Sequence, residues 1–206
     1  MSNYVERFST AERVLHWFVT AGFLTLVLSG LGLYSRLFTG YFNLFGGGQN
    51  AILFHKIAGC IFFVSSLMLF LSHKKDITSF DDDDREWIRG RGGYLSRKES
   101  HFNAGKFNAG QKLFGIFIGG ATLVLGVSGI IIWMPLSFPL LVVQFSLFMH
   151  GLSFVLAVLF VLVHVYLATV GNPGTLEGML YGHVRKIWAR KHHPKWYREV
   201  SDGQGE

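Results

Sequence analysis

Cysteine is almost absent from this sequence, and its long apolar segments contain no acidic residue. Cys60 is the single cysteine, which excludes an internal disulfide, an iron–sulfur cluster bound by thiolates and a Cys-x-x-Cys-His haem attachment site. Without aspartate or glutamate in the apolar segments, neither a zinc site of mixed ligands nor a proton pump built on buried carboxylates is expected. A redox centre in this chain would therefore have to be held by histidine.

No segment has the composition of a soluble catalytic domain or of a removable signal peptide. Half of the residues are hydrophobic, and the charged residues are confined to a few blocks, which is typical of a membrane protein. The first apolar segment is too long for a signal-peptide core and lacks a clean small-residue cleavage site. It is therefore predicted to be retained as a helix.

Four segments are long enough to span a bilayer, which takes about 20 apolar residues. They cover residues 14–34, 52–72, 113–133 and 141–168. The sequence therefore predicts an all-α membrane protein, a bundle of four transmembrane helices. Residues 1–170 are predicted to form this transmembrane domain, and residues 171–206 a cytoplasmic helix and tail. The fourth segment exceeds the required length, so it should tilt, kink or extend beyond the lipid.

Lysine and arginine indicate which side of the membrane each connection faces. They precede the first helix, fill the second connection and follow the fourth helix, whereas Arg36 and Lys56 fall on the opposite side. By the positive-inside rule, both termini and the second connection are cytoplasmic. This topology and anionic lipid headgroups explain the net charge of +6, so no nucleic-acid partner is expected. The acidic run 81–84 is predicted to be solvated surface.

Four histidines lie inside the apolar segments or at their ends, namely His16, His55, His150 and His164. An ionisable ring at such depth is costly unless it has a partner. With the amino terminus inside, His16 and His164 fall at the inner depth, and His55 and His150 at the outer depth. The last two histidines share nearly the same helix face roughly 21 Å apart, so each could meet a ring from another helix across a planar cofactor. The four histidines therefore form two level pairs.

Two imidazoles at one depth on separate helices favour axial ligation of a planar iron macrocycle. Two such pairs predict a diheme protein. Because imidazole would fill both axial positions of each iron, the function would be electron transfer. Candidate counter-charges for the haem propionates are Arg13, Arg36 and Lys56. The remaining histidines are predicted to be snorkelling or hydrogen-bonded interface residues: His73, His101, His183, His192 and His193.

An alternative from a different functional class is a helical transporter or assembly protein. Such a protein would use its histidines for protons or packing. It would be colourless when purified, whereas the diheme hypothesis predicts red protein with a b-type absorption band.

Two amides, Asn108 and Gln111, lie where the second connection enters the third helix. They could donate a hydrogen bond to a carbonyl of a ligand, and they could equally cap the helix start. Residues 171–174, Gly-Asn-Pro-Gly, end the fourth helix. The segment after Thr175 has apolar residues on one face and basic residues on the other, which predicts one amphipathic helix on the cytoplasmic surface.

The sequence resembles the cytochrome b, or gamma, subunit of membrane-bound formate dehydrogenase over nearly its whole length. The matching residues are Arg7-Phe8-Ser9, Glu12-Arg13, His16-Trp17, His55, Gly105-Lys106-Phe107-Asn108-Ala109-Gly110-Gln111-Lys112, His150, His164 and the stretch 182–196 with Trp188, His192 and His193. The resemblance implies two haem b groups, the outer one ligated by His55 and His150 and the inner one by His16 and His164. It also implies a menaquinone or ubiquinone site near Asn108, Gln111 and His164.

The resemblance further implies partners and a location. In such complexes a molybdenum or tungsten subunit oxidises formate, an iron–sulfur subunit passes the electrons on, and quinone is reduced at the cytoplasmic side. The chain is thus expected to be a multi-pass protein of the bacterial cytoplasmic (inner) membrane, in a complex that could form a higher oligomer. A nickel–iron hydrogenase or thiosulfate-type reductase has a cytochrome b on the same diheme plan and is the alternative with a different electron donor.

Overall fold

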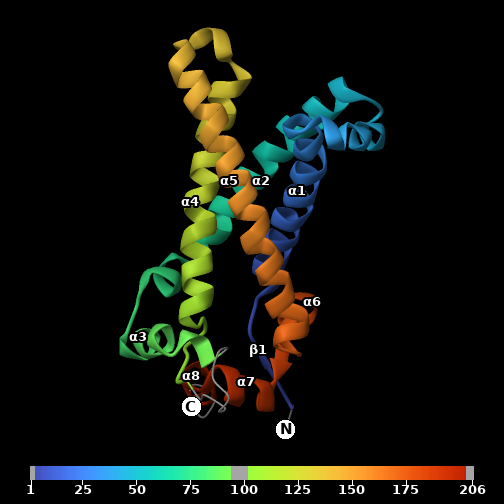
Figure 1. Ribbon diagram of the computed structural model, residues 1–206. Helices are drawn as coiled ribbons and strands as arrows, with labels where there is room; N and C mark the ends of the chain where they lie inside the picture. The colour runs from blue at the N-terminus through green and yellow to red at the C-terminus, as the bar shows by residue number, and fades with distance from the viewer. Residues whose placement is uncertain (1–2, 94–101, 203–206) are drawn as a thin grey trace. The chain divides into compact units, whose positions relative to one another are not determined.

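The structure is a computed structural model that describes residues 3–93 and 102–202 (Figure 1). Arg97, Lys98 and His101, which entered the predictions, lie outside the described residues. In chain order the elements are β1 (Tyr4–Glu6), α1 (Thr10–Tyr34), η1 (Arg36–Phe45), α2 (Gly48–Thr78), α3 (Asp82–Arg89), η2 (Arg91–Gly93), α4 (Ala109–Trp133), η3 (Pro135–Ser137), α5 (Leu140–Tyr166), η4 (Leu167–Gly171), α6 (Thr175–Tyr181), β2 (His183–Arg185), α7 (Lys186–His192) and α8 (Pro194–Asp202).

Among the described residues, four helices are long and apolar enough to cross a membrane: α1, α2, α4, and α5 together with the π-helical turn η4. This confirms the predicted helical membrane fold. In lipid every backbone polar group must be paired within the segment, which a continuous helix achieves. Proline would break such a helix. The four prolines of the chain, at positions 135, 139, 173 and 194, all lie outside the interiors of the spanning helices.

Polar caps explain why α1 and α4 begin earlier than their apolar segments. At the start of α1, the Ser9 Oγ accepts from the Glu12 backbone N–H at 3.3 Å, and the Ser9 N–H donates to the Glu12 carboxylate at 2.6 Å. Asn108 and Gln111 make the same reciprocal pair at the start of α4, at 2.9 and 3.0 Å. Such capping boxes satisfy the free backbone N–H groups of the first turn. Each helix therefore starts in the polar layer, before its apolar run.

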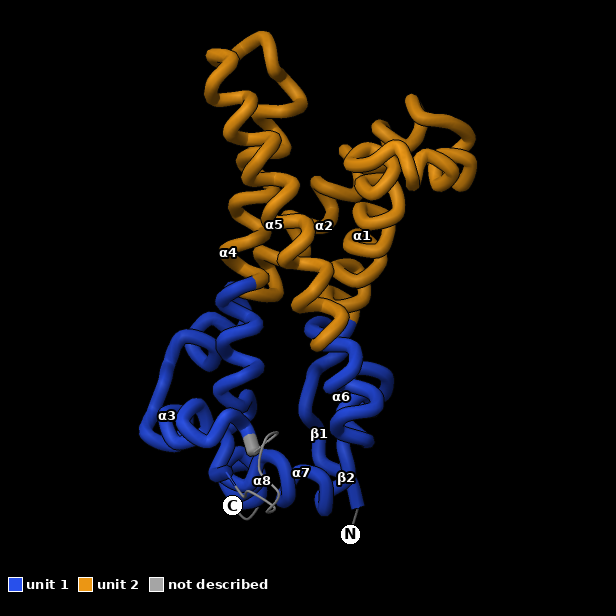
Figure 2. Tube along the Cα trace, in the orientation of Figure 1, with its two compact units in different colours: residues 1–13, 71–117, 164–206 blue, residues 14–70, 118–163 orange. Residues whose placement is uncertain are grey.

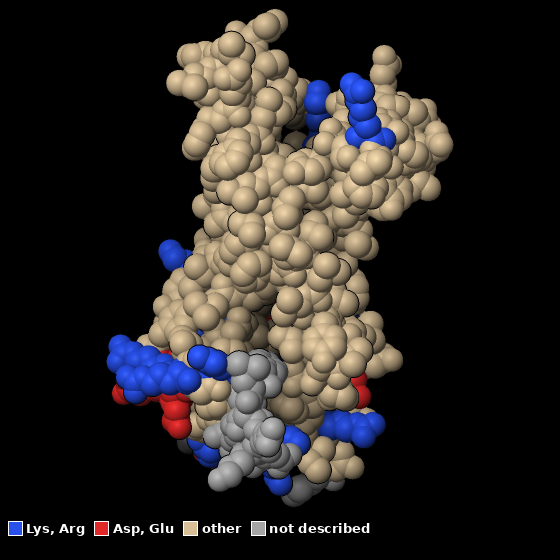
Figure 3. Space-filling view, viewed as in Figure 1, with Lys and Arg blue, Asp and Glu red and all other residues tan. Residues whose placement is uncertain are grey.

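The chain forms two compact units (Figure 2). Unit 1 comprises Met1–Arg13, Leu71–Phe117 and His164–Glu206, and unit 2 comprises Val14–Phe70 and Ile118–Val163. The only charged residues of unit 2 are Arg36 and Lys56, so the face of unit 2 in Figure 3 is almost free of charge. Unit 1 contains every acidic residue of the chain. Unit 2 is therefore the apolar body expected in the hydrocarbon layer.

Within unit 2, helices α2 and α4 approach closely through glycine. A Cβ atom at Gly119 would lie 2.9 Å from the Phe70 ring, and one at Gly126 would lie 2.6 Å from the Phe63 ring. Ser66 and Thr122 add a hydrogen bond of 3.1 Å between the two hydroxyl groups. Small residues that let two backbones approach are a common basis of helix packing in membranes. The predicted structural role of the glycine-rich third span fits these contacts.

Unit 1 joins the two ends of the described chain. Strand β1 pairs antiparallel with β2, with Val5 opposite Val184. The core beneath this pair consists of buried residues from β1, β2, α7 and α8: Val5, Val184, Trp188, Ala189 and Trp196. A two-stranded ribbon is marginal by itself. Here the packing of the two tryptophans provides the apolar surface that it needs.

The single amphipathic helix predicted after Thr175 is wrong. Gly182 ends α6 with φ +86°, and a Cβ atom there would lie 2.9 Å from the Phe8 carbonyl oxygen. The next residues form β2 instead of continuing the helix. Val184 and Trp188, which were expected on a lipid-facing side, are buried in the protein core, while Ile187 is 77% exposed.

The acidic run in the second connection is only partly solvated. Asp81 caps α3 through a capping box with Asp84. Asp84 is 5% exposed, and its carboxylate accepts from the Lys112 ammonium at 2.5 Å. Lys112 also donates to the Ser79 carbonyl at 2.8 Å. The prediction of a solvated run is therefore wrong for Asp84, because a buried lysine from α4 requires an anionic partner.

Candidate functional site

The outer histidine pair meets in unit 2. His55 lies near the start of α2 and His150 near the middle of α5, and their ring centres are 6.4 Å apart with 54° between the ring planes. Both rings are half-buried. Two imidazole–metal bonds of about 2.0–2.1 Å each place the ring centres about 6.3 Å apart when both rings bind the same ion. The two rings are therefore spaced for axial ligation of one metal ion.

The type of metal site follows from what surrounds the pair. Among residues 3–93 and 102–202, no group of three or more histidine, cysteine or acidic side chains is gathered for metal binding. A pair of histidines supplies two ligands, which is too few for a tetrahedral zinc site. The remaining ligands must come from a non-protein group, and a porphyrin supplies four nitrogens in the plane between two axial imidazoles. The residues present thus fit a haem.

Two serines contact this histidine pair, one for each ring. Ser29 on α1 lies 2.8 Å from His55 Nδ1, and Ser128 on α4 lies 2.9 Å from His150 Nδ1. Both serines are buried. Sequence reasoning missed them, because serine is an ordinary residue in membrane helices.

A glycine follows each of these serines and leaves space for the ring. A Cβ atom at Gly30 would lie 3.2 Å from His55 Cε1, and one at Gly129 would lie 3.5 Å from His150 Cε1. The signal available in the sequence was therefore a repeated Ser-Gly dipeptide, each followed by a histidine early in the next apolar segment.

The inner histidines are placed separately by the structure. His16, in unit 2, contacts the neighbouring Trp17 edge to face, with ring centres 5.3 Å apart. His164, in unit 1, stacks on Phe114 with ring centres 4.6 Å apart and 2° between the planes. Because the two histidines belong to different units, their pairing stays a prediction.

Asn108 and Gln111 use their side-chain oxygens in the capping box of α4. The prediction that these amides cap the helix start is therefore confirmed. A hydrogen bond to a ligand would have to come from their amide nitrogens. Phe114 lies one turn further along α4 and stacks on His164. The start of α4 and the inner histidine of unit 1 thus lie close together.

A second polar cluster in unit 1 was not anticipated. The Glu12 carboxylate pairs with His73 Nε2 at 3.2 Å and with the Lys106 ammonium at 3.1 Å. The His73 side chain is 7% exposed, and its ring contacts Phe8 and Phe107. His73 was predicted to be a hydrogen-bonded interface residue, and this pairing fits that prediction. Glu12 therefore both caps α1 and holds the ends of three segments together.

Arg7 is the centre of a buried basic cluster in unit 1. Its Nη2 donates to the Lys106 carbonyl at 2.9 Å and lies 3.0 Å from His193 Nε2, while its guanidinium lies over the rings of Trp188 and Trp196. Burial lowers the pKa of Arg7 to about 9, so it stays charged at neutral pH. No described residue accepts from its Nη1, and the indole faces stabilise the cation instead.

His193 is held neutral in this cluster. Its Nδ1 donates to the Gly105 carbonyl at 2.7 Å, which leaves Nε2 to accept from Arg7. Burial and the Arg7 charge set the pKa of His193 well below its ordinary value. The prediction that His193 is a hydrogen-bonded residue and not a metal ligand agrees with these contacts.

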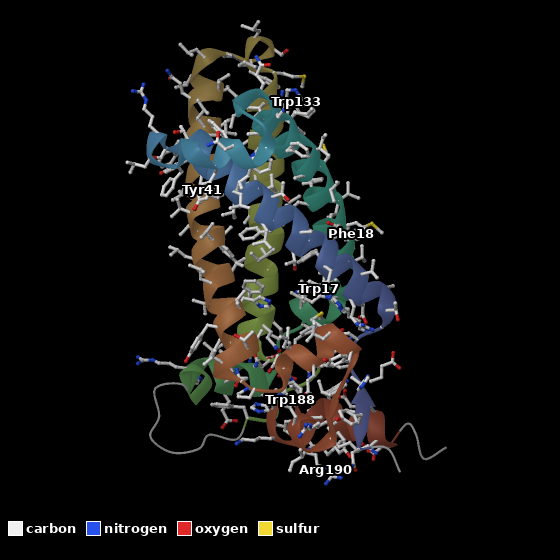
Figure 4. All side chains as sticks on the ribbon, turned by 90° about the vertical axis from the view of Figure 1, so that its right-hand side faces the viewer. Trp17, Phe18, Tyr41, Trp133, Trp188 and Arg190 are labelled. Atoms are coloured by element: carbon white, nitrogen blue, oxygen red, sulfur yellow. The ribbon has the colours of Figure 1, made fainter. Side chains whose placement is uncertain are left out.

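Two of the three candidate counter-charges, Arg13 and Lys56, have other contacts in this structure. Arg13 donates to the carbonyls of Met179 and Leu180 at 3.3 and 2.6 Å. Lys56 lies over the Trp133 ring, 4.7 Å from its centre. Trp133, which is labelled in Figure 4, is the last residue of α4. Their predicted role toward propionates stays a prediction.

Comparisons with known proteins identify the family of this chain. The model of the prokaryotic cytochrome b561 family matches residues 7–182. Two Escherichia coli K12 proteins are similar over most of both chains. The cytochrome b556(Fdn) subunit of the nitrate-inducible formate dehydrogenase is 31% identical over 100% of this chain and 95% of its own length. The formate dehydrogenase cytochrome b556(fdo) subunit is 32% identical over 95% of this chain and 93% of its own length. The formate dehydrogenase cytochrome b556 subunit of Haemophilus influenzae is 29% identical over 94% of this chain and 82% of its own length.

These matches cover all four spanning helices and the histidines within them. They favour an electron carrier over the transporter or assembly protein considered as an alternative. The chain belongs to the prokaryotic cytochrome b561 family, together with the cytochrome b556 subunits of formate dehydrogenase, and its role is membrane electron transfer with haem b.

Proposed function

We propose that this chain is the membrane subunit of a formate dehydrogenase complex and carries electrons from an iron–sulfur subunit to a quinone. The observation that carries this proposal is the His55–His150 pair, whose ring centres lie 6.4 Å apart inside an apolar unit. The names of the similar proteins from Escherichia coli and Haemophilus influenzae supply the choice of formate dehydrogenase.

The four intramembrane histidines are assigned as the haem ligands. His55 and His150 bind the outer haem b, and His16 and His164 bind the inner one. When bound by these residues, each haem would supply one-electron redox chemistry. The protein surrounds these histidines with apolar helices, which exclude water from the site and hold the ligands on fixed backbones.

Quinone reduction is assigned to the start of α4. The amide nitrogens of Asn108 and Gln111 donate hydrogen bonds to a carbonyl oxygen of menaquinone or ubiquinone, while their oxygens keep the helix capped. The stack of Phe114 on His164 supports this location, because it brings the first turns of α4 to an inner haem ligand.

The orientation follows from the charged residues. The Lys and Arg residues of unit 1 favour a cytoplasmic location for both termini and for the connection between α2 and α4. In the bacterial inner membrane, this orientation directs electrons from an outer donor toward quinone at the cytoplasmic side. A molybdenum or tungsten subunit that oxidises formate and an iron–sulfur subunit complete the complex.

The test is to purify the chain from native membranes with its attached subunits. We expect red protein with two haem b groups per copy of this chain, together with attached iron–sulfur and molybdenum or tungsten subunits. Formate should reduce the haems, which is seen as the absorption band of reduced haem b. Addition of a quinone analogue should reoxidise the haems, so that this band disappears.

Two outcomes would contradict the proposal in different ways. Reduction by hydrogen and not by formate would replace the formate dehydrogenase assignment with a hydrogenase and leave the electron-transfer role intact. Purified complex without haem in this subunit would overturn the assignment of all four histidines.

A further inference from the structure

The two helix hairpins of unit 2 carry the same arrangement of three residues. In the hairpin of α1 and α2, Ser29 and Gly30 of the first helix contact His55 of the second. In the hairpin of α4 and α5, Ser128 and Gly129 contact His150. The hydrogen-bond lengths agree within 0.1 Å, at 2.8 and 2.9 Å. Each histidine of the outer pair is thus held by the helix that precedes it.

We propose that Ser29 and Ser128 are positioning residues that fix the tautomer and orientation of His55 and His150, so that Nε2 of both rings bears the lone pair that binds iron. This inference rests on the proposed function insofar as it takes these histidines to be haem ligands.

The direction of the two hydrogen bonds follows from the other bonds of the serines. Ser29 Oγ donates to the carbonyl four residues earlier, at Thr25, with a distance of 2.7 Å. Ser128 Oγ donates to the corresponding carbonyl at Val124, at 2.6 Å. A hydroxyl group has one proton. Because each serine gives that proton to the backbone, its oxygen can only accept from the histidine.

The protonation of each ring is then determined. Nδ1 must carry the proton that the serine oxygen accepts, and a neutral imidazole has one N–H. Nε2 is therefore unprotonated in both His55 and His150. A metal-binding histidine usually donates its other N–H to a nearby acceptor, which fixes the ring and makes it a better electron donor to the metal. Both serines supply this acceptor.

Another serine in the same unit shows what a purely structural role looks like. Ser65 on α2 is buried and donates to the Ile61 carbonyl at 2.7 Å, the same bond that Ser29 and Ser128 make. The Ser65 hydroxyl contacts the carbonyls of its own helix, at Ile61 and Phe62. Ser65 is therefore a matched control for the back-bond without the contact to an outer-pair histidine.

The test compares single alanine variants of the purified complex at Ser29, Ser128 and Ser65. For S29A and S128A, we expect both haems to be retained, the midpoint potential of the outer haem to rise, and that of the inner haem to stay unchanged. The potential rises because an imidazole whose N–H loses its acceptor donates less electron density and stabilises ferric iron less. The outer haem should also pass to an excess of a haem-binding globin about 10 to 100 times faster, the usual range for loss of such an outer partner.

Conservative variants distinguish positioning from packing. S29T and S128T keep a hydroxyl group that can accept from Nδ1, and we expect them to restore the potential toward that of the unmodified protein. S65A and S65T should leave both potentials unchanged. The electron paramagnetic resonance spectrum of the ferric outer haem gives a second readout, because it reports the relative orientation of the two imidazole planes.

The inference is overturned if S29A and S128A keep both haems with unchanged potentials and spectra, or if S65A shifts the outer potential as much as they do. If the unmodified subunit contains no haem, the proposed function itself fails, and this result is distinguishable from the first two because no variant is needed to see it.

Discussion

The two units of this protein hold their polar groups by different means. In unit 2, polar contacts are few and neutral: a serine holds each histidine of the outer pair, and a serine–threonine bond joins α2 to α4. In unit 1, charged groups are paired at close range, as in the contacts of Asp84 with Lys112 and of Glu12 with Lys106. The spanning unit thus depends on local helix contacts and the polar unit on pairs between distant segments.

This difference has a physical reason. In the hydrocarbon layer an unpaired charge is costly, so function there depends on neutral donors and acceptors with fixed directions. In a polar layer, charges can be paired as the segments come together, and the pairs then join pieces that are far apart in the sequence. Loss of a residue should therefore cause a local defect in unit 2 and a defect of the whole unit in unit 1.

The largest expected effect is in unit 2. His150→Ala should abolish the outer haem and leave the inner haem bound, because the two ligand pairs are separate. Haem content, measured in the reduced protein, should fall from two groups to one per chain, and quinone-linked reduction of the remaining haem should persist. His73→Ala, which removes a histidine outside the pairs, should keep both haems. Equal loss of both haem spectra in H150A would contradict separate ligand pairs.

A charge deletion in unit 1 should lower stability instead of cofactor content. Asp84→Ala leaves the Lys112 ammonium buried without its anionic partner, which typically costs about 3–5 kcal/mol. Thermal unfolding of the complex, followed by tryptophan fluorescence, measures this loss. Asp82→Ala is the matched control, because that side chain is 96% exposed and forms an ion pair with the exposed Arg85. Equal unfolding temperatures for the two variants would show that the Asp84 pair does not stabilise unit 1.

The buried imidazole of His193 in unit 1 should make stability depend on pH. Burial and Arg7 depress the pKa of His193 in the folded state, so protonation favours the unfolded chain. The free energy of unfolding should therefore fall as the pH drops below about 6.5, by at most about 1.4 kcal/mol per pH unit for one proton. His193→Gln should flatten this dependence, and an unchanged slope in H193Q would contradict the prediction. His192, whose pKa burial also lowers, should contribute to the remaining slope.

The smallest expected effect is at Asn108, where two variants distinguish helix capping from ligand binding at the start of α4. Asn108→Asp keeps the side-chain oxygen that caps the helix and removes the amide N–H donor, whereas Asn108→Ala removes both. We expect N108D to retain both haems and the stability of the helix start and to slow quinone turnover about threefold to tenfold, the equivalent of one hydrogen bond. N108A should in addition lose about 1 kcal/mol of stability. Unchanged turnover in both Asn108→Ala and Gln111→Ala would move the quinone site elsewhere.

The sequence predicted the four spanning helices and the level pairing of His55 with His150, because hydrophobic length and helical rise depend on one segment at a time. It underestimated α2, which continues to Thr78, because a helix can persist in the polar layer after its apolar run has ended. These successes and errors both come from local properties of the chain.

What the sequence could not predict depends on pairing between distant segments. Ser29 is identical in type to Ser65, which bonds to its own helix, and its contact with His55 exists only once α1 and α2 are side by side. Strands β1 and β2 have three residues each, too few to show an alternating pattern. Asp84 appears as one of four consecutive acidic residues, and nothing in that run identifies the one that meets Lys112.

The pairing of Tyr4–Glu6 with His183–Arg185 constrains the order of biosynthesis. The first strand leaves the ribosome long before its partner, which is made only after the last spanning helix. Until then β1 has an exposed edge, and the polar layer cannot close around Trp188 and Trp196. Insertion of the spanning helices should therefore precede formation of the β1–β2 pair and its core. A subunit that binds to this region could do so only after β2 has been translated.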